Sequence, residues 1–387
     1  MAAALAAAGH DVTLACGRYQ GAATGLEGRF RRGARQGVVA GFTVREFDIS
    51  CANAQGLAAR SLAFLRFAAA SSRLALSQEW DLIIASSTPL TVAIPALLAK
   101  ARRGTPFIFE IRDPWPELPH ALSAGGGGVP GPVLAAMGRL ADAACSRADA
   151  VVALSDGMAR TAIARGTDPA RLIVLPQGAD AAMFRDRGAG WRPEGLAPGT
   201  VLAVYAGAHG RANGLDQLLD AAARLRGSPV RLLLVGEGAE KRHLMARAVA
   251  ENLPVDFRDP MPKARLAGLL AGADLGLLCL APIAEFAEWT APNKLAEGLA
   301  AGLPMVANVA GAAARLLADS GAGLAVRPGD AAALAEALLA LAADPARRLA
   351  MSHAARIVAR RRLDARRIAQ SLVALAERTA APRRQMA

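Results

Sequence analysis

Short apolar runs alternate with longer amphipathic segments along almost the whole chain. The runs are rich in Val, Ile and Leu, and in the segments between them apolar residues recur with a helical period. Strands that alternate with helices in this way form βαβ units around a parallel sheet. The pattern therefore predicts an α/β protein, and it passes through two successive series.

The first series has expected strands at residues 12–15, 42–47, 82–85, 107–110, 150–154 and 172–175, with helices at 57–78, 92–102, 131–147 and 155–165. The second series has expected strands at residues 201–205, 230–235, 255–257, 275–278, 305–307 and 323–326. Two such series predict two Rossmann-like domains whose parallel sheets face a cleft.

A charged segment with Gly, Pro and Trp191 separates the two series. The 387 residues suit two domains, on a prior of roughly 150 residues each. We predict a first domain over residues 1–185, a linker over 186–199, a second domain over 200–365, and a closing helix and tail over 366–387.

Composition narrows the class of protein. The chain is 53% hydrophobic, yet no run approaches the roughly 20 apolar residues of a membrane-spanning helix. Residues 1–8 lack the basic start of a secretory signal. The four cysteines are scattered, without a CxxC pair or a His at metal spacing. This usage predicts a reduced, cytoplasmic protein without a structural metal site.

The formal net charge is +12, and nearly all of the basic residues are arginines. Nucleic acid, anionic lipid or diphosphate partners, and a bias of the coding sequence would each explain such a charge. We expect no nucleic-acid binding, because the chain has no reading motif and no aromatic and basic platform. The arginines within residues 29–35 and 356–367 leave two readings open, a rim that faces an anionic membrane surface or a solvated face.

The segment 291–304 carries the most specific chemistry. It predicts a turn that ends in Pro292, a helix that carries Lys294 and Glu297, and a Gly-Leu-Pro exit into an apolar run. Backbone N–H groups at the helix start and the Lys294 charge suit a nucleoside diphosphate, and Glu297 can accept hydrogen bonds from ribose hydroxyls. The alternative is a capped surface helix with a Lys294–Glu297 pair.

This segment resembles the donor-nucleotide site of family-4 glycosyltransferases of the GT-B fold. It is most similar to the branch that builds bacterial surface polysaccharides, whose members include N-acetylfucosamine transferases. The resemblance extends from Gly9 to about Ala365. It implies that Pro292, Asn293, Lys294 and Glu297 bind the donor, and that the closing helices pack back toward the first domain.

The same resemblance implies a retaining, hexosyltransferase-type reaction in exopolysaccharide or O-antigen synthesis. The donor would be a nucleoside-diphosphate sugar, most simply UDP-linked. The acceptor would be a lipid-diphosphate-linked sugar, which implies a peripheral place on the inner face of the cell membrane. The chain shows no Asp-x-Asp cluster of the kind that metal-dependent sugar transferases use, so we expect neither a cofactor nor a required metal.

A glycine-rich loop after the strand at 201–205 is a second donor-binding candidate. The wider family places Arg and Lys where this chain has Ala208 and Asn213, so the charge on the leaving diphosphate would be met by Arg211 and Lys294. His209 contacts a ligand here or has a structural role. The expected donor-binding residues of this loop are Gly207, His209, Arg211 and Asn213.

Two further loops resemble the family's nucleotide site. Gly236 lies in a Val-Gly-Glu-Gly loop, which fails as a dinucleotide fingerprint because Lys241 stands at the third Gly position. A dehydrogenase is therefore disfavoured. Arg258 and Met261 stand where family members hold the base through backbone groups.

The loop at 110–117 follows a strand and contains Arg-Asp-x-Trp-Pro-Glu. Ligands bind at this end of strands in open α/β sheets, so Asp113 or Glu117 is expected to hydrogen-bond the acceptor hydroxyl, while Trp115 packs on a sugar face. The alternative is a local ion pair of Arg112 with Asp113 or Glu117, which would only fix the loop.

Two features depart from the family's pattern. The family's Glu-x7-Glu motif is incomplete, because Trp289 stands eight residues before Glu297. We expect Glu288, one place off, or Trp289 to shape the sugar pocket. The segment at Gly9 normally follows a first strand, a Gly-rich loop and most of a helix, so the resemblance implies a chain shortened by about 20–30 residues, the size of one strand–helix unit.

These departures keep two other functions open. An inactive homologue that acts as a partner subunit would tolerate Ala208 and Trp289. A sugar-nucleotide epimerase of the same fold would turn over the donor without an acceptor.

Overall fold

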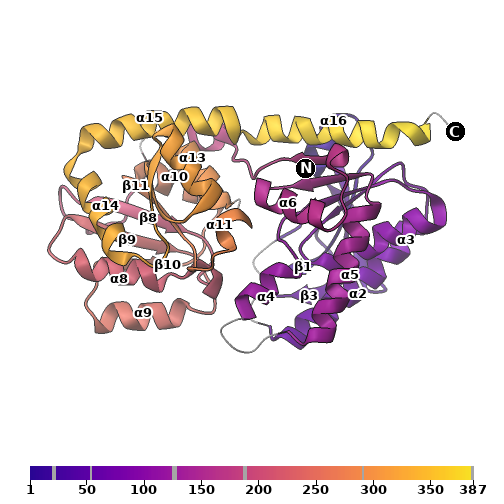
Figure 1. Cartoon of the computed structure of the whole chain (residues 1–387), viewed down its shortest axis with the longest axis horizontal. Coiled ribbons are helices and arrows are strands. Elements are labelled where there is room, and N and C mark those ends of the chain that lie inside the picture. Colours follow the sequence, from indigo (N-terminus) through magenta and orange to yellow (C-terminus); the bar gives the residue numbers. More distant parts are fainter. Residues whose placement is uncertain (20–22, 53–54, 124–128, 186–189, 290–291, 385–387) are drawn as a thin grey trace. The chain divides into compact units, whose positions relative to one another are not determined.

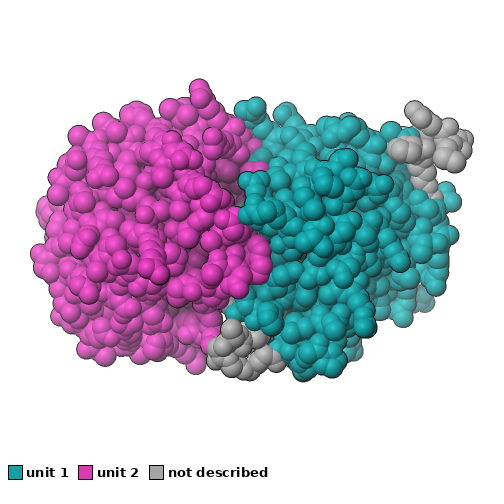
Figure 2. Space-filling model, in the orientation of Figure 1, with its two compact units in different colours: residues 1–175, 367–387 teal, residues 176–366 magenta. Residues whose placement is uncertain are grey.

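The computed structural model describes residues 1–19, 23–52, 55–123, 129–185, 190–289 and 292–384. The chain forms two compact units, one of residues 1–175 with 367–387 and one of residues 176–366 (Figure 2). The division falls between Leu175 and Pro176, ten residues before the boundary expected from the sequence.

Unit 1, whose residues 1–175 run from indigo to magenta in Figure 1, contains a four-stranded parallel sheet in the order β4-β5-β6-β7. Its strands are β4 (Ile83–Ser86), β5 (Phe107–Ile111), β6 (Ala150–Ala153) and β7 (Leu172–Val174). Every residue of β5 and β6 is buried, and apart from Glu110 both strands consist of apolar residues.

A second sheet of unit 1 has the order β1-β3-β2, from β1 (Thr13–Tyr19), β2 (Ala34–Val39) and β3 (Phe42–Cys51). Strand β2 pairs antiparallel with β3 and was missed in the sequence, because Arg35, Gln36 and Gly37 interrupt its apolar pattern. The turn between them is Ala40-Gly41, both with positive φ (51° and 85°), a geometry usually announced by Asn-Gly.

Helices cover the four-stranded sheet on both faces. Residues of α3 and α5 form a buried cluster with Phe107 and Phe109, whereas Leu372 and Leu375 of α16 pack with Ile108 on the other face. Of the closing helices expected to pack toward the first domain, α16 does so, whereas Leu334 and Leu338 of the earlier helix α14 (Ala331–Ala343) lie in the core of unit 2. The helices of this unit are α1 (Ala2–Ala7), α2 (Leu57–Ala75), α3 (Ala93–Arg103), α4 (Glu117–Ser123), α5 (Gly131–Arg147), α6 (Asp156–Ala164) and α16 (Ala365–Arg384, whose first two residues belong to unit 2).

Unit 2 contains a six-stranded, wholly parallel sheet in the order β10-β9-β8-β11-β12-β13. Its strands are β8 (Val201–Ala206), β9 (Val230–Val235), β10 (Val255–Arg258), β11 (Leu275–Cys279), β12 (Met305–Asn308) and β13 (Gly323–Val326), which confirms the six strands expected here. The strand order reverses between β8 and β11, and ligands of open α/β sheets bind beyond such a reversal, at the carboxyl ends of the strands.

The helices of unit 2 are α7 (Ala181–Arg185), α8 (Asp216–Arg224), α9 (Lys241–Ala250), α10 (Lys263–Gly272), α11 (Phe286–Trp289), α12 (Asn293–Ala301), α13 (Gly311–Ser320), α14 (Ala331–Ala343) and α15 (Pro345–Arg362). Within the described ranges, no helix is both long and apolar enough to cross a lipid bilayer.

The part of the expected linker that the structure describes packs against unit 2. Trp191 Nε1 donates to the Arg265 carbonyl (3.0 Å), and its ring lies against Gly268, where a Cβ would come 3.0 Å from Trp191 Cδ1. Arg192 pairs with Asp274 (2.9 Å). Residues 186–189 lie outside the described residues.

Candidate active site

The loops that follow β8 and β9 interlock through their backbones. The Gly207 N–H donates to the Val235 carbonyl (2.9 Å), and the His209 N–H donates to the Glu237 carbonyl (2.9 Å). A Cβ on Gly236 would lie only 1.9 Å from the Gly207 oxygen, and one on Gly238 would lie 2.3 Å from the His209 oxygen. Gly236 is therefore required by contact between the two loops.

His209 stands at the centre of these loops and is fully buried. Its ring lies 6.0 Å from that of Tyr205 and edge-to-face with that of Phe257, at 6.2 Å between centroids. Neither ring nitrogen has a hydrogen-bond partner in the part of the chain that the structure describes. Burial, and then the charge of Lys241, lower the pKa of His209 to about 4, so the imidazole is neutral at pH 7.

Lys294 lies in the first turn of α12 and reaches back to the loop after β8. Its Nζ donates to Asn213 Oδ1 (2.6 Å) and lies 4.8 Å from the centre of the Tyr205 ring. Its alkyl chain fills the space beside Gly207, where a Cβ would come 2.1 Å from Lys294 Cε. In this structure the Lys294 side chain therefore occupies the space that a side chain at position 207 would need.

The environment of Lys294 is unusual for an ammonium. Desolvation lowers the pKa of Lys294 to about 8, with a smaller opposing effect from the nearby Cys279. Among the described side chains, no carboxylate forms an ion pair with it. A desolvated cation without a carboxylate partner among the described residues favours an anionic ligand.

Glu297 lies one turn after Lys294 on α12 and pairs with Lys263 of α10 (3.0 Å). The Glu297 side chain is 14% exposed, against 58% for Lys263. The alternative of a Lys294–Glu297 pair is therefore wrong, since each side chain has a different partner. Pro292 precedes the helix in an extended conformation, and Asn293 is its exposed first residue. Ala291 lies outside the described residues.

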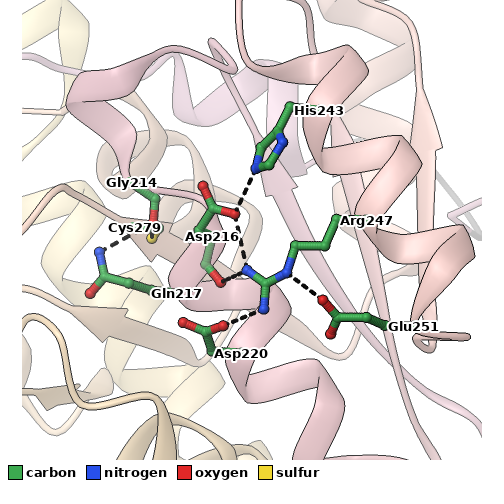
Figure 3. A network of polar contacts seen from close by, with 8 residues as sticks. All are labelled: Gly214, Asp216, Gln217, Asp220, His243, Arg247, Glu251 and Cys279. Atoms are coloured by element: carbon green, nitrogen blue, oxygen red, sulfur yellow. Dashed lines mark hydrogen bonds and ion pairs between the residues drawn. The ribbon is translucent and has the colours of Figure 1, made fainter.

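A polar network fixes the start of helix α8, which follows the glycine-rich loop after β8 (Figure 3). Arg247 of α9 binds three carboxylates, those of Asp216 (3.0 Å), Asp220 (2.5 Å) and Glu251 (2.7 Å). His243 lies 3.3 Å from Asp216. Helices α8 and α9 are thereby held together.

Gln217 links the glycine-rich loop after β8 to the ends of neighbouring strands. Its Nε2 donates to the carbonyls of Gly214 (3.2 Å) and Leu280 (3.1 Å), while its Oε1 accepts from Asn308 Nδ2 (2.8 Å) and the Gly329 N–H (2.6 Å). Figure 3 shows this side chain beside Gly214 and the Cys279 sulfur. Sequence analysis missed Gln217, because its partners lie far along the chain.

Lys241 was noted only as a departure from a fingerprint, yet it connects two site loops. The residue is 7% exposed, and its Nζ binds Asp259 (2.5 Å) after β10 and Glu237 (3.1 Å) after β9. The sequence signal for this role of Lys241 was its position, where the dinucleotide fingerprint has its third glycine.

The residues expected to hold a base line a pocket of about 450 Å³. Arg258, Asp259, Pro260 and Met261 form one side, and Trp191, Arg192, Pro193, Glu194 and Arg265 complete the lining. Arg265 lies over the Trp191 ring, at 5.4 Å from its centroid. Sequence analysis did not assign Trp191 or Arg265 to this place.

Arg211 and Gly210 are the open part of the glycine-rich loop. Arg211 is exposed at the start of a short 3-10 turn, and a Cβ on Gly210 would meet no atom within 4 Å. The structure therefore brings Gly207, Asn213 and Lys294 into contact, places His209 in the same loop, and leaves Arg211 on the surface.

In unit 1, the loop after β5 holds Asp113, whose carboxylate accepts a hydrogen bond from the Thr88 hydroxyl. Glu117 begins α4 and pairs with Arg165 (2.6 Å), which also binds Asp142 (2.6 Å). The alternative of an Arg112–Glu117 pair is thus wrong. Trp115 is partly buried and packs against the buried cluster of this unit.

Glu288 lies on α11, one residue before Trp289, and approaches Arg315 of α13 (3.6 Å). The two helices meet closely, because a Cβ on Gly311 would come 1.9 Å from the Ala287 carbonyl oxygen. Glu288 and the expected donor residues belong to unit 2, whereas Asp113 and Glu117 belong to unit 1.

Two family models match successive parts of the chain. The glycosyl transferase 4-like domain matches residues 1–178, and the glycosyl transferases group 1 model matches residues 200–344. The chain is also 31% identical, over 192 residues, to the D-inositol 3-phosphate glycosyltransferase of Nocardia farcinica, a match that covers 46% of this chain and 41% of that protein. The chain thus spans less than half the length of the curated relatives it matches.

Two solved structures are similar over most of the chain. The sucrose-phosphate synthase of Thermosynechococcus elongatus has a TM-score of 0.78 at 18% identity, over 98% of this chain and 92% of that one. Anabaena Alr3699/HepE in complex with UDP has a TM-score of 0.63 at 20% identity, over 84% of each chain. At these identities the likeness shows a shared fold.

Proposed function

We propose that this chain, which matches two glycosyl transferase family models in succession and has the GT-B fold, transfers a sugar with retention from a UDP-sugar to a lipid-diphosphate-linked saccharide. One observation carries the donor part of this proposal. Lys294 offers a desolvated ammonium without a carboxylate partner in the described structure, at the N-terminal turn of a helix. An ammonium and free N–H groups together favour a diphosphate.

The chemistry of the proposed reaction places little demand on acid–base groups. The acceptor hydroxyl attacks C1 of the sugar on the face from which the diphosphate leaves, and the leaving phosphate oxygen takes the hydroxyl proton. The C1–O bond to the acceptor forms as the C1–O bond to the diphosphate breaks. Catalysis then consists of positioning the reactants and stabilising negative charge on the leaving group.

Each candidate residue has a part in this proposal. Lys294 binds the diphosphate, and Glu297 accepts hydrogen bonds from the ribose hydroxyls. Arg258 and Met261 border the pocket that takes the base. Asp113 orients the acceptor hydroxyl, whereas the Arg165 pair of Glu117 supports a role in holding that loop. The proposal includes no metal, because Lys294 and backbone N–H groups supply the positive potential.

A surface of unit 1 supports a place at the membrane, which a lipid-linked acceptor requires. Helix α2 has no acidic residue and exposes Leu62 (54%) and Leu65 (57%) beside the exposed Arg66 and Arg73. An apolar face flanked by arginines suits an anionic lipid surface.

The arginine-rich segment at residues 29–35 fits this role only in part. Arg29, Arg31 and Arg32 are exposed, whereas Arg35 binds Glu46 (2.6 Å) and the Gly28 carbonyl (3.0 Å). Arg35 is thus occupied within unit 1 and contributes little to a lipid-facing rim.

Titration calorimetry with UDP, GDP and ADP tests the donor site directly. We expect selective UDP binding that is lost in Lys294→Met, and turnover of a UDP-sugar only when an acceptor is present. Product formed from the donor alone would indicate an epimerase instead. A folded chain that binds none of the three nucleotides would contradict the proposal and favour a non-catalytic partner subunit.

A further inference from the structure

The backbone that carries Asn213 is clamped on several sides. Gly214 has φ +55°, and a Cβ there would lie 2.8 Å from Ala281 Cα. The Ala281 N–H donates to the Ala212 carbonyl (2.9 Å), and the Asn213 N–H donates to the Gly210 carbonyl (2.9 Å). The Asn213 side chain therefore projects from a fixed base, and its Oδ1 accepts from Lys294 Nζ at 2.6 Å.

Three described side chains near Lys294 are uncharged near neutral pH. The phenol of Tyr205 on β8 lies beneath the ammonium, the Cys279 thiol lies on β11, and His209 lies in the loop after β8. A Tyr face attracts a cation and an amide oxygen accepts one of its protons, but neither neutralises it. The excess positive charge stays available to an anion.

An amide at position 213 suits this arrangement better than either charged alternative. An aspartate of nearly the same shape would neutralise the ammonium and compete with an anionic ligand. A lysine would repel Lys294 across the 2.6 Å contact. The amide oxygen uses one of the three N–H donors of Lys294 and leaves two for a ligand.

We propose that Asn213 is a positioning residue that holds the Lys294 ammonium over Gly207, so that this single cation binds the diphosphate of the donor. The proposal rests on the proposed donor site, and it identifies Asn213 as the residue that keeps the ammonium available to the donor. It also explains why Ala208 and Asn213 can replace the two basic residues expected from the resemblance. The chain concentrates the charge on one lysine that is already held in its binding position. Less conformational entropy is therefore lost when the diphosphate binds.

A pH signature follows from the same groups. The pKa of Lys294 is lowered to about 8, whereas burial raises the pKa of Cys279 to about 12 and that of Tyr205 further, and the pKa of His209 falls to about 4. Among these four described side chains, Lys294 alone then titrates between pH 7 and 9. A bound diphosphate stabilises the charged form, so binding takes up a proton near pH 8.

The test is a double-mutant cycle on UDP affinity, with calorimetry at pH 6.5 and 9.0. The variants are Asn213→Ala, Lys294→Met and the double variant, with Asn252→Gly, at an exposed asparagine of positive φ, as the control. We expect Lys294→Met to weaken binding about 10–100-fold at pH 6.5, and Asn213→Ala to weaken it about fivefold or more. In the Lys294→Met background, Asn213→Ala should change affinity less than twofold.

A second variant separates positioning from simple packing. Asn213→Asp keeps the size of the side chain and its contact with Lys294, so a structural role would leave UDP affinity unchanged. Positioning of a free charge predicts a loss of about tenfold or more at pH 6.5, with proton uptake on binding reduced at pH 8. Thermal unfolding of each variant checks that it is folded, and Asn213→Ser replaces any variant that is not.

The outcomes distinguish this inference from the proposed function. If Lys294→Met loses UDP binding but Asn213→Ala and Asn213→Asp bind like the parent, the donor site stands and the role of Asn213 is wrong. Equal losses for Asn213→Ala in both backgrounds would also overturn it. If the parent chain binds no nucleotide, the proposed function itself fails.

Discussion

The side chain of Lys294 occupies the volume that any side chain on residue 207 would need. A Cβ there would come 2.1 Å from Lys294 Cε and 3.1 Å from Nζ. The two residues lie 87 positions apart, on the loop after β8 and the first turn of α12. The identity of residue 207 therefore decides where the proposed phosphate-binding ammonium can stand.

Gly207→Ala tests this relationship. The added methyl group should displace Lys294 from its contact with Asn213, weaken UDP binding by about tenfold or more, and destabilise the fold by ~1–3 kcal/mol through overpacking. Calorimetric titration and thermal unfolding measure the two effects. Gly210→Ala is the matched control in the same loop, since its Cβ would meet nothing within 4 Å. Equal UDP affinities of the two variants would contradict the assignment.

Glu297→Gln should weaken UDP binding about 3–10-fold but leave the binding of inorganic pyrophosphate unchanged, because the proposed role of this carboxylate is toward the ribose. Competition titrations with the two ligands measure the difference. Lys263→Met removes the exposed partner of Glu297 and should change UDP affinity little, because exposed ion pairs contribute about 0–1 kcal/mol. A parallel loss of pyrophosphate binding in Glu297→Gln would count against a ribose contact.

His209 should make the folded state sensitive to acid. Its pKa falls from 6.5 to about 4 in the folded chain, so between these pH values the unfolded chain binds more protons. The free energy of unfolding then decreases as the pH falls from about 6.5 to about 4. In His209→Leu this part of the decrease should disappear, as measured by denaturant unfolding across that range.

His243→Gln is the control for that experiment, since His243 is exposed and lies on α9. It should retain the acid sensitivity of the parent. An identical pH dependence in His209→Leu and the parent would show that His209 is already protonated or accessible in the folded state.

Removal of divalent metal with EDTA should leave UDP affinity and sugar transfer unchanged. The physical reason is that Lys294 and the N–H groups of α12 supply the charge that a metal would otherwise bring to the diphosphate. Turnover with and without EDTA measures this. Activity lost in EDTA and restored by Mg²⁺ would overturn the metal-independent form of the proposal.

The protein should bind anionic vesicles through helix α2. The measurement is sedimentation with vesicles of phosphatidylglycerol and phosphatidylcholine. The double variant Leu62→Ser, Leu65→Ser should lower the partition coefficient about tenfold, because two apolar side chains no longer enter the interface. Raised salt should weaken the remaining binding.

Val249→Ser removes an exposed apolar residue of α9 in unit 2 and serves as the control. It should partition like the parent. Equal binding of all three proteins, or equal binding to purely neutral vesicles, would argue against α2 as the lipid-facing surface.

Much of the fold was readable from local pattern. The strands at 230–235 and 107–111 are apolar apart from Arg231 and Glu110, because nearly all of their residues are buried, and this signal survives without any tertiary information. The antiparallel strand β2 was not predicted, because it is half-exposed and polar. Its only local marker was an Ala-Gly turn. Alternation of strands and helices was thus sufficient for the α/β class and for the parallel sheet of unit 2.

The partners of the charged residues were not readable in this way. The sequence determined which residue types stand at strand ends, including Asp113, Asn213, Lys294 and Glu297. Tertiary structure alone decided that Glu117 pairs with Arg165 and that Lys294 pairs with Asn213. Periodicity reports burial relative to a sheet or helix axis, whereas an ion pair or a shared cavity depends on how loops far apart in sequence meet in space.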